Sequence, residues 1–152
     1  MIVRATLEDA EVLTEIAVKS KAYWGYENDQ VESWREDLTV TPKMFDESNI
    51  YKYIVDNQIG GFYILERANI RTSFLNFLFV SPDYIKQGIG HQLLEHAISY
   101  CKDGGSAILN VLSDPNAASF YAKYGFEVIA QRESSIPGRF LPEMELEFPE
   151  NQ

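Results

Sequence analysis

A glycine-containing turn between an apolar strand and a helix is the clearest chemical signal in the sequence. The segment Thr72–Val80 is rich in β-branched and aromatic residues, and a loop connects it to Gly88-Ile89-Gly90, where a helical apolar period begins. Glycines leave the backbone N–H groups of a helix start accessible, and these groups with the helix dipole favour a phosphate. The spacing predicts a diphosphate-binding loop, although a turn that merely needs glycine explains the same residues.

Two familiar nucleotide-binding loops do not fit this segment. The sequence has no Gly-x4-Gly-Lys-Ser/Thr, and a dinucleotide fingerprint starting at Gly88 would need a glycine where Leu93 stands. Lys86 adds one positive charge beside the loop, but the chain as a whole is acidic. The peptide groups of the loop must therefore provide most of the phosphate binding.

A second segment begins with a helix start signal. Asp114-Pro115 supplies an N-cap and a first-turn proline for a short helix that stops at Gly125. Taken alone, Phe120 and Tyr121 on this helix are more typical of core aromatics than of a site.

Together the two segments resemble the GNAT superfamily of N-acetyltransferases. The acyl-CoA loop of that family reads Arg/Gln-x-x-Gly-x-Gly/Ala, and here only its first position departs, as Ile85. The second signature, Asn-x-x-Ala-x-x-Phe-Tyr-x-x-x-Gly-Phe, is followed from Asp114 to Phe126 with Asp114 in place of the first Asn. The resemblance covers most of the chain and implies direct attack of a neutral amine on acetyl-CoA, with no metal.

The resemblance also implies roles for individual residues. Tyr121 is expected to be the general acid beside the coenzyme A sulfur. A phenol has an ordinary pKa of about 10 and a thiol one of about 8.5, so proton transfer from the phenol to the thiolate is unfavourable by roughly 2 kcal/mol. Tyr121 is therefore expected to act chiefly as a hydrogen-bond donor. The residues expected to bind coenzyme A are Phe79, Val80, Ile85, Lys86, Gln87, Gly88, Ile89, Gly90, Asp114, Asn116, Ala117 and Phe120.

No general base can be assigned from the sequence. Many family members carry an acid on the strand that leads into the acyl-CoA loop, but the matching position here is Asn76, which cannot take a proton at neutral pH. His91 and His96 lie off the apolar stripe of the long helix and are predicted to be surface residues. Deprotonating a lysine-like amine costs about 4.6 kcal/mol at pH 7, whereas positioning supplies about 7 to 11 kcal/mol, so a modest base suffices.

The acceptor side is expected after the first helix and in the loop before the last strand. Trp24, Tyr26 and Trp34, with nearby acids, could hold an amine through cation–π contacts, although core packing explains them equally well. Arg139 could recognise a carboxylate or pair with surface acids. The residues expected to bind the acceptor are Trp24, Tyr26, Asn76 and Arg139.

The order of the elements predicts one mixed α/β domain over residues 1–152. We expect a twisted mixed sheet with a parallel central strand pair and helices on both faces. Strands are expected at 2–5, 50–56, 61–67, 72–80, 107–112, 127–132 and 141–148. Helices are expected from about residues 6 to 24, at 29–38, after Thr41, at 89–101 and from 114 to 125.

Composition bounds the function further. Of 152 residues 45% are hydrophobic, and the net charge is −10. The sequence contains one cysteine, Cys101, and two histidines. These values favour a cytoplasmic protein that binds neither nucleic acid, membrane nor metal. The leading hypothesis is an acetyltransferase for a primary amine of a small molecule or protein. A non-catalytic acyl-CoA-binding or regulatory module and a purely structural interaction domain are the alternatives, and a homodimer is left open.

Overall fold

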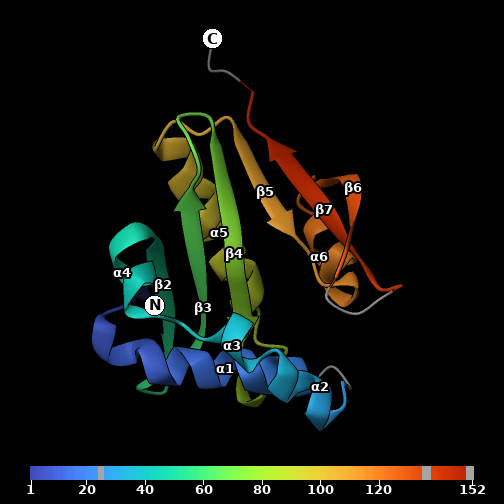
Figure 1. The fold of residues 1–152 in the computed structure, drawn as a ribbon. Helices are drawn as coiled ribbons and strands as arrows, with labels where there is room; N and C mark the ends of the chain where they lie inside the picture. Colours follow the sequence, from blue (N-terminus) through green and yellow to red (C-terminus); the bar gives the residue numbers. More distant parts are fainter. Residues whose placement is uncertain (24–25, 135–137, 150–152) are drawn as a thin grey trace. The chain divides into compact units, whose positions relative to one another are not determined.

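The strands of the protein form one mixed seven-stranded sheet. The computed structural model describes residues 1–23, 26–134 and 138–149, and the sheet order is β1-β2-β3-β4-β5-β7-β6 (Figure 1). β4 and β5 pair in parallel from Thr72 with Ile108 to Leu75 with Val111, which confirms the predicted parallel pair. The strands are β1 (Ile2–Arg4), β2 (Asn49–Val55), β3 (Gln58–Arg67), β4 (Thr72–Val80), β5 (Ile108–Leu112), β6 (Glu127–Glu133) and β7 (Phe140–Glu147).

Helices connect these strands and account for the helical segments that the sequence predicts. The α-helices are α1 (Ala10–Tyr23), α2 (Asn28–Ser33), α3 (Arg35–Leu38), α4 (Pro42–Glu47), α5 (Ile89–Asp103) and α6 (Ala118–Ala122), and the short 3-10 helices are η1 (Leu7–Asp9), η2 (Pro82–Tyr84) and η3 (Pro115–Ala117). The predicted helix over 29–38 is divided at Trp34, whose ring packs edge-on against Tyr26 at 5.0 Å. Within the described ranges, no helix has both the length and the apolar character that crossing a bilayer requires.

The contacts divide the chain into two compact units, which we describe separately. The first unit comprises residues 1–65 and 77–97, and the second comprises 66–76 and 98–152.

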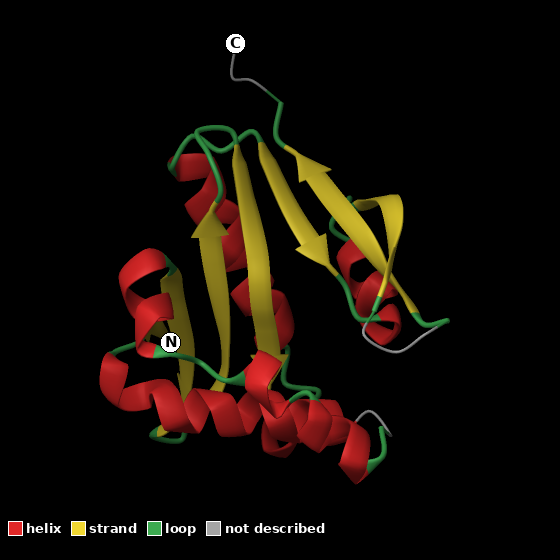
Figure 2. Cartoon of the chain, in the orientation of Figure 1, coloured by secondary structure: helices red, strands yellow, loops and turns green. Residues whose placement is uncertain are grey.

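In the first unit, helices cover both faces of the strands (Figure 2). Phe62 and Ile64 of β3 belong to the apolar cluster that contains Leu13 of α1, whereas the intervening Tyr63 bonds to His96 of α5. Because successive side chains of a strand point to opposite faces, α1 and α5 lie on opposite sides of β3. The apolar stripe predicted for α5 is buried, with Ile89, Leu93, Leu94 and Ala97 each at most 2% exposed.

The hairpin that joins β2 and β3 differs from the sequence prediction. The sequence analysis expects strands at 50–56 and 61–67 and so leaves 57–60 for the turn, but the turn consists of Asp56 and Asn57, whose φ angles are 52° and 61°. Gly60 and Gly61 instead lie inside β3, where the register with β2 shifts at a bulge. These glycines permit close packing, because a Cβ on Gly61 would lie 2.8 Å from the carbonyl oxygen of Phe79.

We expect Gly61→Ala to lower the free energy of unfolding by about 1 to 3 kcal/mol, because the added methyl group must displace backbone or the Leu93 side chain 3.0 Å away. Urea denaturation of the two proteins measures the difference. An unchanged midpoint and slope would show that this part of β3 yields without cost.

In the second unit, β7 lies between β5 and β6 and pairs antiparallel with both. Leu109, Tyr121, Phe126 and Met144 are buried there. The guanidinium of Arg67 donates to the carbonyl oxygens of Gly104 at 2.7 Å and Ile70 at 2.8 Å. Arg67 thus joins the turn between β3 and β4 to the end of α5.

Candidate active site

The predicted diphosphate loop lies in the first unit and starts α5. Ser81 donates its N–H to the carbonyl oxygen of Gly60 at 2.8 Å, which ties the start of the loop to β3. Gln92 donates to Gly88 at 3.1 Å, so the N–H groups of residues 88–91 precede the first bond within the helix. Gly88 has a φ of 77°, and a Cβ added to it would meet nothing within 4 Å. This loop can present several N–H groups to an anion at the positive end of a helix.

The residues before Gly88 have distinct environments. Ile85 is half-buried with extended backbone, so it fills the first motif position with an apolar side chain. Lys86 and Gln87 are exposed. Lys86 has a φ of 71°, a left-handed conformation uncommon for residues with a Cβ. Phe79, Val80 and Gly90, also predicted to contact coenzyme A, are half-buried and Ile89 is buried.

The second signature lies in the second unit, where Asp114 caps a helical turn as predicted. Its Oδ1 accepts the N–H of Asn116 at 2.9 Å, and its Oδ2 lies 3.4 Å from Nη2 of Arg139. Both side chains of this ion pair are largely buried, at 16% and 21% exposure. Arg139 is therefore paired with an acid of the protein itself, but with the largely buried Asp114 and not with the surface acids that the sequence analysis considered.

Tyr121 lies on α6 and is only 6% exposed. Its ring makes edge contacts with Phe120 at 5.2 Å and Phe126 at 5.4 Å, which restrict its orientation. Burial, and next the negative charge of Asp114, raise the pKa of the Tyr121 phenol well above its ordinary value. The phenol is thus a proton-retaining group and a hydrogen-bond donor over a wide pH range.

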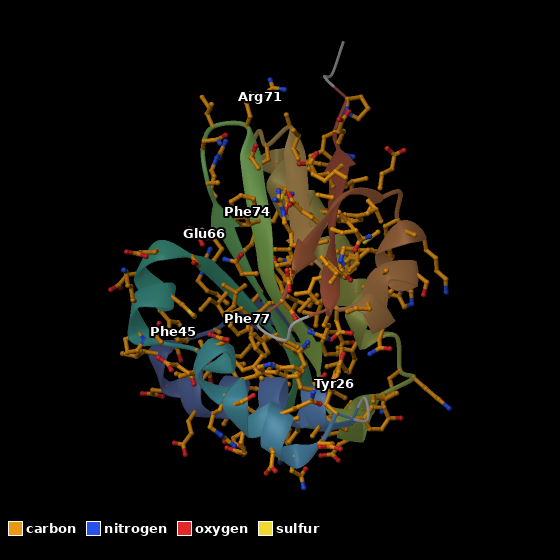
Figure 3. All side chains as sticks on the ribbon, turned by 45° about the vertical axis from the view of Figure 1, so that its right-hand side comes forward. Tyr26, Phe45, Glu66, Arg71, Phe74 and Phe77 are labelled. Atoms are coloured by element: carbon orange, nitrogen blue, oxygen red, sulfur yellow. The ribbon has the colours of Figure 1, made fainter. Side chains whose placement is uncertain are left out.

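The sequence analysis missed a carboxylate next to Asn76. In the second unit, Nδ2 of Asn76 on β4 donates to Oε2 of Glu66 on β3 at 2.9 Å. Both side chains are exposed, and Glu66 is labelled in Figure 3 with Phe74. Asn76 is the first residue of β4 beyond the register shared with β5. Because the two residues are ten positions apart, only the pairing of β3 with β4 could reveal this contact.

The aromatic residues predicted for the acceptor are brought together in part. In the first unit, Tyr26 and Trp34 contact each other, and the ammonium of Lys21 on α1 lies 5.9 Å and 5.8 Å from their ring centres (Tyr26 is labelled in Figure 3). Trp24, the remaining predicted acceptor residue, lies outside the described residues. Neither Lys21 nor its position over the rings followed from the sequence.

The two histidines differ from each other. His91 is exposed as predicted, but the surface prediction for His96 is wrong. Nδ1 of His96 lies 2.7 Å from the hydroxyl of the fully buried Tyr63, and burial lowers the pKa of His96. Its polar nitrogen reaches across the helix–sheet contact, which a helical wheel cannot reveal. In the part of the chain that the structure describes, no three His, Cys, Asp or Glu side chains are grouped to hold a metal ion.

The comparisons with known proteins agree with this fold. Residues 9–148 match the family described as acetyltransferase (GNAT) domain. The peptidyl-lysine N-acetyltransferase YjaB of Salmonella typhimurium is 35% identical over 75 residues, 49% of this chain and 50% of that protein, so the chain matches half of that relative's length. The uncharacterized N-acetyltransferase YafP of Escherichia coli is 25% identical over 80% of this chain and 75% of that protein.

A solved structure extends the likeness to the whole fold. The PaiA N-acetyltransferase of Thermoplasma acidophilum, solved in complex with coenzyme A, superposes with a TM-score of 0.79 over 97% of this chain and 98% of that one, at 23% identity. The chain belongs to the GNAT acetyltransferase family.

Proposed function

We propose that this protein transfers the acetyl group of acetyl-CoA to a primary amine by direct attack. The observation that carries the proposal is the start of α5, where Gly88 leaves open space beside N–H groups that precede the first helical bond. An N–H array at a helix N-terminus suits a diphosphate, and coenzyme A contains one. The two ordered signatures of the family support the same ligand.

In the proposed reaction, the amine nitrogen bonds to the acetyl carbon and the bond from that carbon to sulfur breaks. The departing thiolate takes a hydrogen bond, and then a proton, from Tyr121. The raised pKa of this phenol means that hydrogen bonding to the developing charge provides most of the stabilisation. The ordered ring, held between Phe120 and Phe126, keeps that donor in place.

The amine must also lose a proton. We propose that the Glu66 carboxylate takes this proton. Asn76 cannot take a proton, but its amide holds the Glu66 carboxylate at 2.9 Å. Glu66 would thus supply an acid beside the position where the family resemblance led us to look for one. A carboxylate that accepts the proton during attack provides general base catalysis.

The first test measures acetyl-CoA binding by calorimetry and thiol release with a panel of primary amines. We expect Gly88→Ala to weaken acetyl-CoA binding about tenfold, because an L-residue is strained at a φ of 77° and the backbone relieves that strain by moving the N–H groups out of position. Gly105→Ala is the matched control. Gly105 also has a positive φ, 85°, but it lies at the other end of α5, so acetyl-CoA affinity should not change.

Two results would contradict the proposal. Equal acetyl-CoA affinity of Gly88→Ala and wild-type protein would remove the diphosphate assignment. Acetyl-CoA binding without thiol release for any amine would instead identify a non-catalytic acyl-CoA-binding module.

A further inference from the structure

Three aromatic rings of the first unit surround one cation of the protein. The ammonium nitrogen of Lys21 lies 5.9 Å from the ring centre of Tyr26, 5.8 Å from that of Trp34 and 6.0 Å from that of Phe79. An ammonium within about 6 Å of an aromatic face is attracted by the ring quadrupole. We call Tyr26, Trp34 and Phe79 the aromatic cage.

Neighbouring contacts hold each ring of the cage. Tyr26 and Trp34 meet edge to face, with an interplanar angle of 79°. Phe79 packs against Phe62 and Phe77, at 6.1 Å and 5.9 Å, and so rests on the buried cluster of the unit. Tyr26 and Trp34 lie on either side of α2, whereas Phe79 lies on β4, so the tertiary structure of the unit brings the three rings together.

The cage lies next to the predicted diphosphate loop within the same unit. Phe79 is the penultimate residue of β4, and the loop to α5 follows it directly. The helix α1, which carries Lys21, contacts the η2 turn of that loop. A ligand of the cage would therefore lie close to the site that we propose for acetyl-CoA.

The cage does not suit the nitrogen that reacts. Attack on a thioester requires a neutral amine, and an aromatic cage stabilises the charged form, which opposes deprotonation. The same argument makes Lys21 itself a poor acceptor while its ammonium lies among the rings. The cage suits an ammonium that stays charged throughout the reaction.

We infer that the aromatic cage binds a second, non-reacting ammonium group of the acceptor, and that Lys21 occupies it when no acceptor is bound. The inference rests on the proposed function and narrows the acceptor to amines with two cationic nitrogens, of the diamine class. The net charge of −10 favours the approach of such a dication. An acceptor with one amine gains nothing from the cage.

The test compares α,ω-diamines from 1,3-diaminopropane to 1,6-diaminohexane with monoamines of the same length. For wild-type protein, we expect kcat/KM for the best diamine to exceed that for its monoamine at least fivefold. Lys21→Met keeps an unbranched side chain but removes the competing ammonium, so KM for that diamine should fall about fivefold while the monoamine values stay constant. Trp34→Leu should abolish the preference, and Trp34→Phe, which keeps a ring, should retain most of it.

A second measurement does not depend on turnover. The best diamine should raise the Tm of Lys21→Met more than that of wild-type protein, and the Tm of each variant without ligand shows whether it folds. Equal kcat/KM for diamines and monoamines, an unchanged diamine KM in Lys21→Met, or acetylation of Lys21 found by mass spectrometry would overturn the inference. Thiol release from monoamines would then leave the proposed function intact. A diamine-dependent Tm shift without any thiol release would support the cage and count against the proposed function.

Discussion

Tyr121→Phe is expected to lower kcat about 100-fold while acetyl-CoA binds within about twofold of its wild-type affinity. Removing one preorganised donor to a developing negative charge typically costs this factor or more. The substitution keeps the ring, so the edge contacts with Phe120 and Phe126 remain and the fold should tolerate it. Stopped-flow measurement of thiol release separates the chemical step from product release.

Tyr124→Phe is the matched control, because it removes a hydroxyl three residues further along, just after the same short helix, and should leave kcat unchanged. The pH dependence provides a second check. Since burial and Asp114 raise the pKa of Tyr121, the phenol stays protonated as the pH rises through its ordinary value of about 10. At any pH below about 10, loss of the phenol proton should therefore not lower the kcat of the wild-type protein. A normal kcat for Tyr121→Phe would show that another group meets the thiolate.

Glu66→Gln is expected to lower kcat by about 100-fold, the lower end of what general base catalysis provides. The amide is close in shape to the carboxylate and is exposed, so folding should be unaffected. KM for acetyl-CoA should not change, because Glu66 is assigned to the amine proton alone. Glu47→Gln is the control, because it removes the same charge from α4. The Glu47 side chain is exposed and forms a long ion pair with Lys43 at 3.9 Å.

A second substitution makes this prediction specific. Adding Asn76→Asp to Glu66→Gln exchanges the amide and the carboxylate across the 2.9 Å hydrogen bond, so that a carboxylate is again present at this place. We expect kcat of the double variant to be at least tenfold higher than that of Glu66→Gln alone. If Glu66→Gln kept wild-type kcat, or if the exchange restored nothing in a protein that still binds acetyl-CoA, the carboxylate would have no part in proton removal.

Local features of the chain were predictable because they depend on nearby residues. The helix start at residues 88–90 follows from glycine and a change of apolar period, and the structure places α5 there. The cap at Asp114 likewise needs only the N–H of Asn116 two residues on. The parallel pair of β4 and β5 follows from the long helix between them, since such strands need a crossover.

Contacts between distant segments were not predictable in this way. Asn57, Gly60 and Gly61 are typical turn residues, and only packing against Phe79 and α5 shows that both glycines lie inside a strand that begins at Gln58. The Glu66 carboxylate beside Asn76 and the Lys21 ammonium among three rings depend on strand register and on helix placement. By itself the sequence determined the family, because two signatures in the expected order carry it. The diphosphate loop and the Tyr121 phenol are predictions that this resemblance supports. Only the tertiary structure decided that Glu66 lies beside Asn76 and Lys21 among three rings, because strand register and helix placement bring these residues together from separate parts of the sequence.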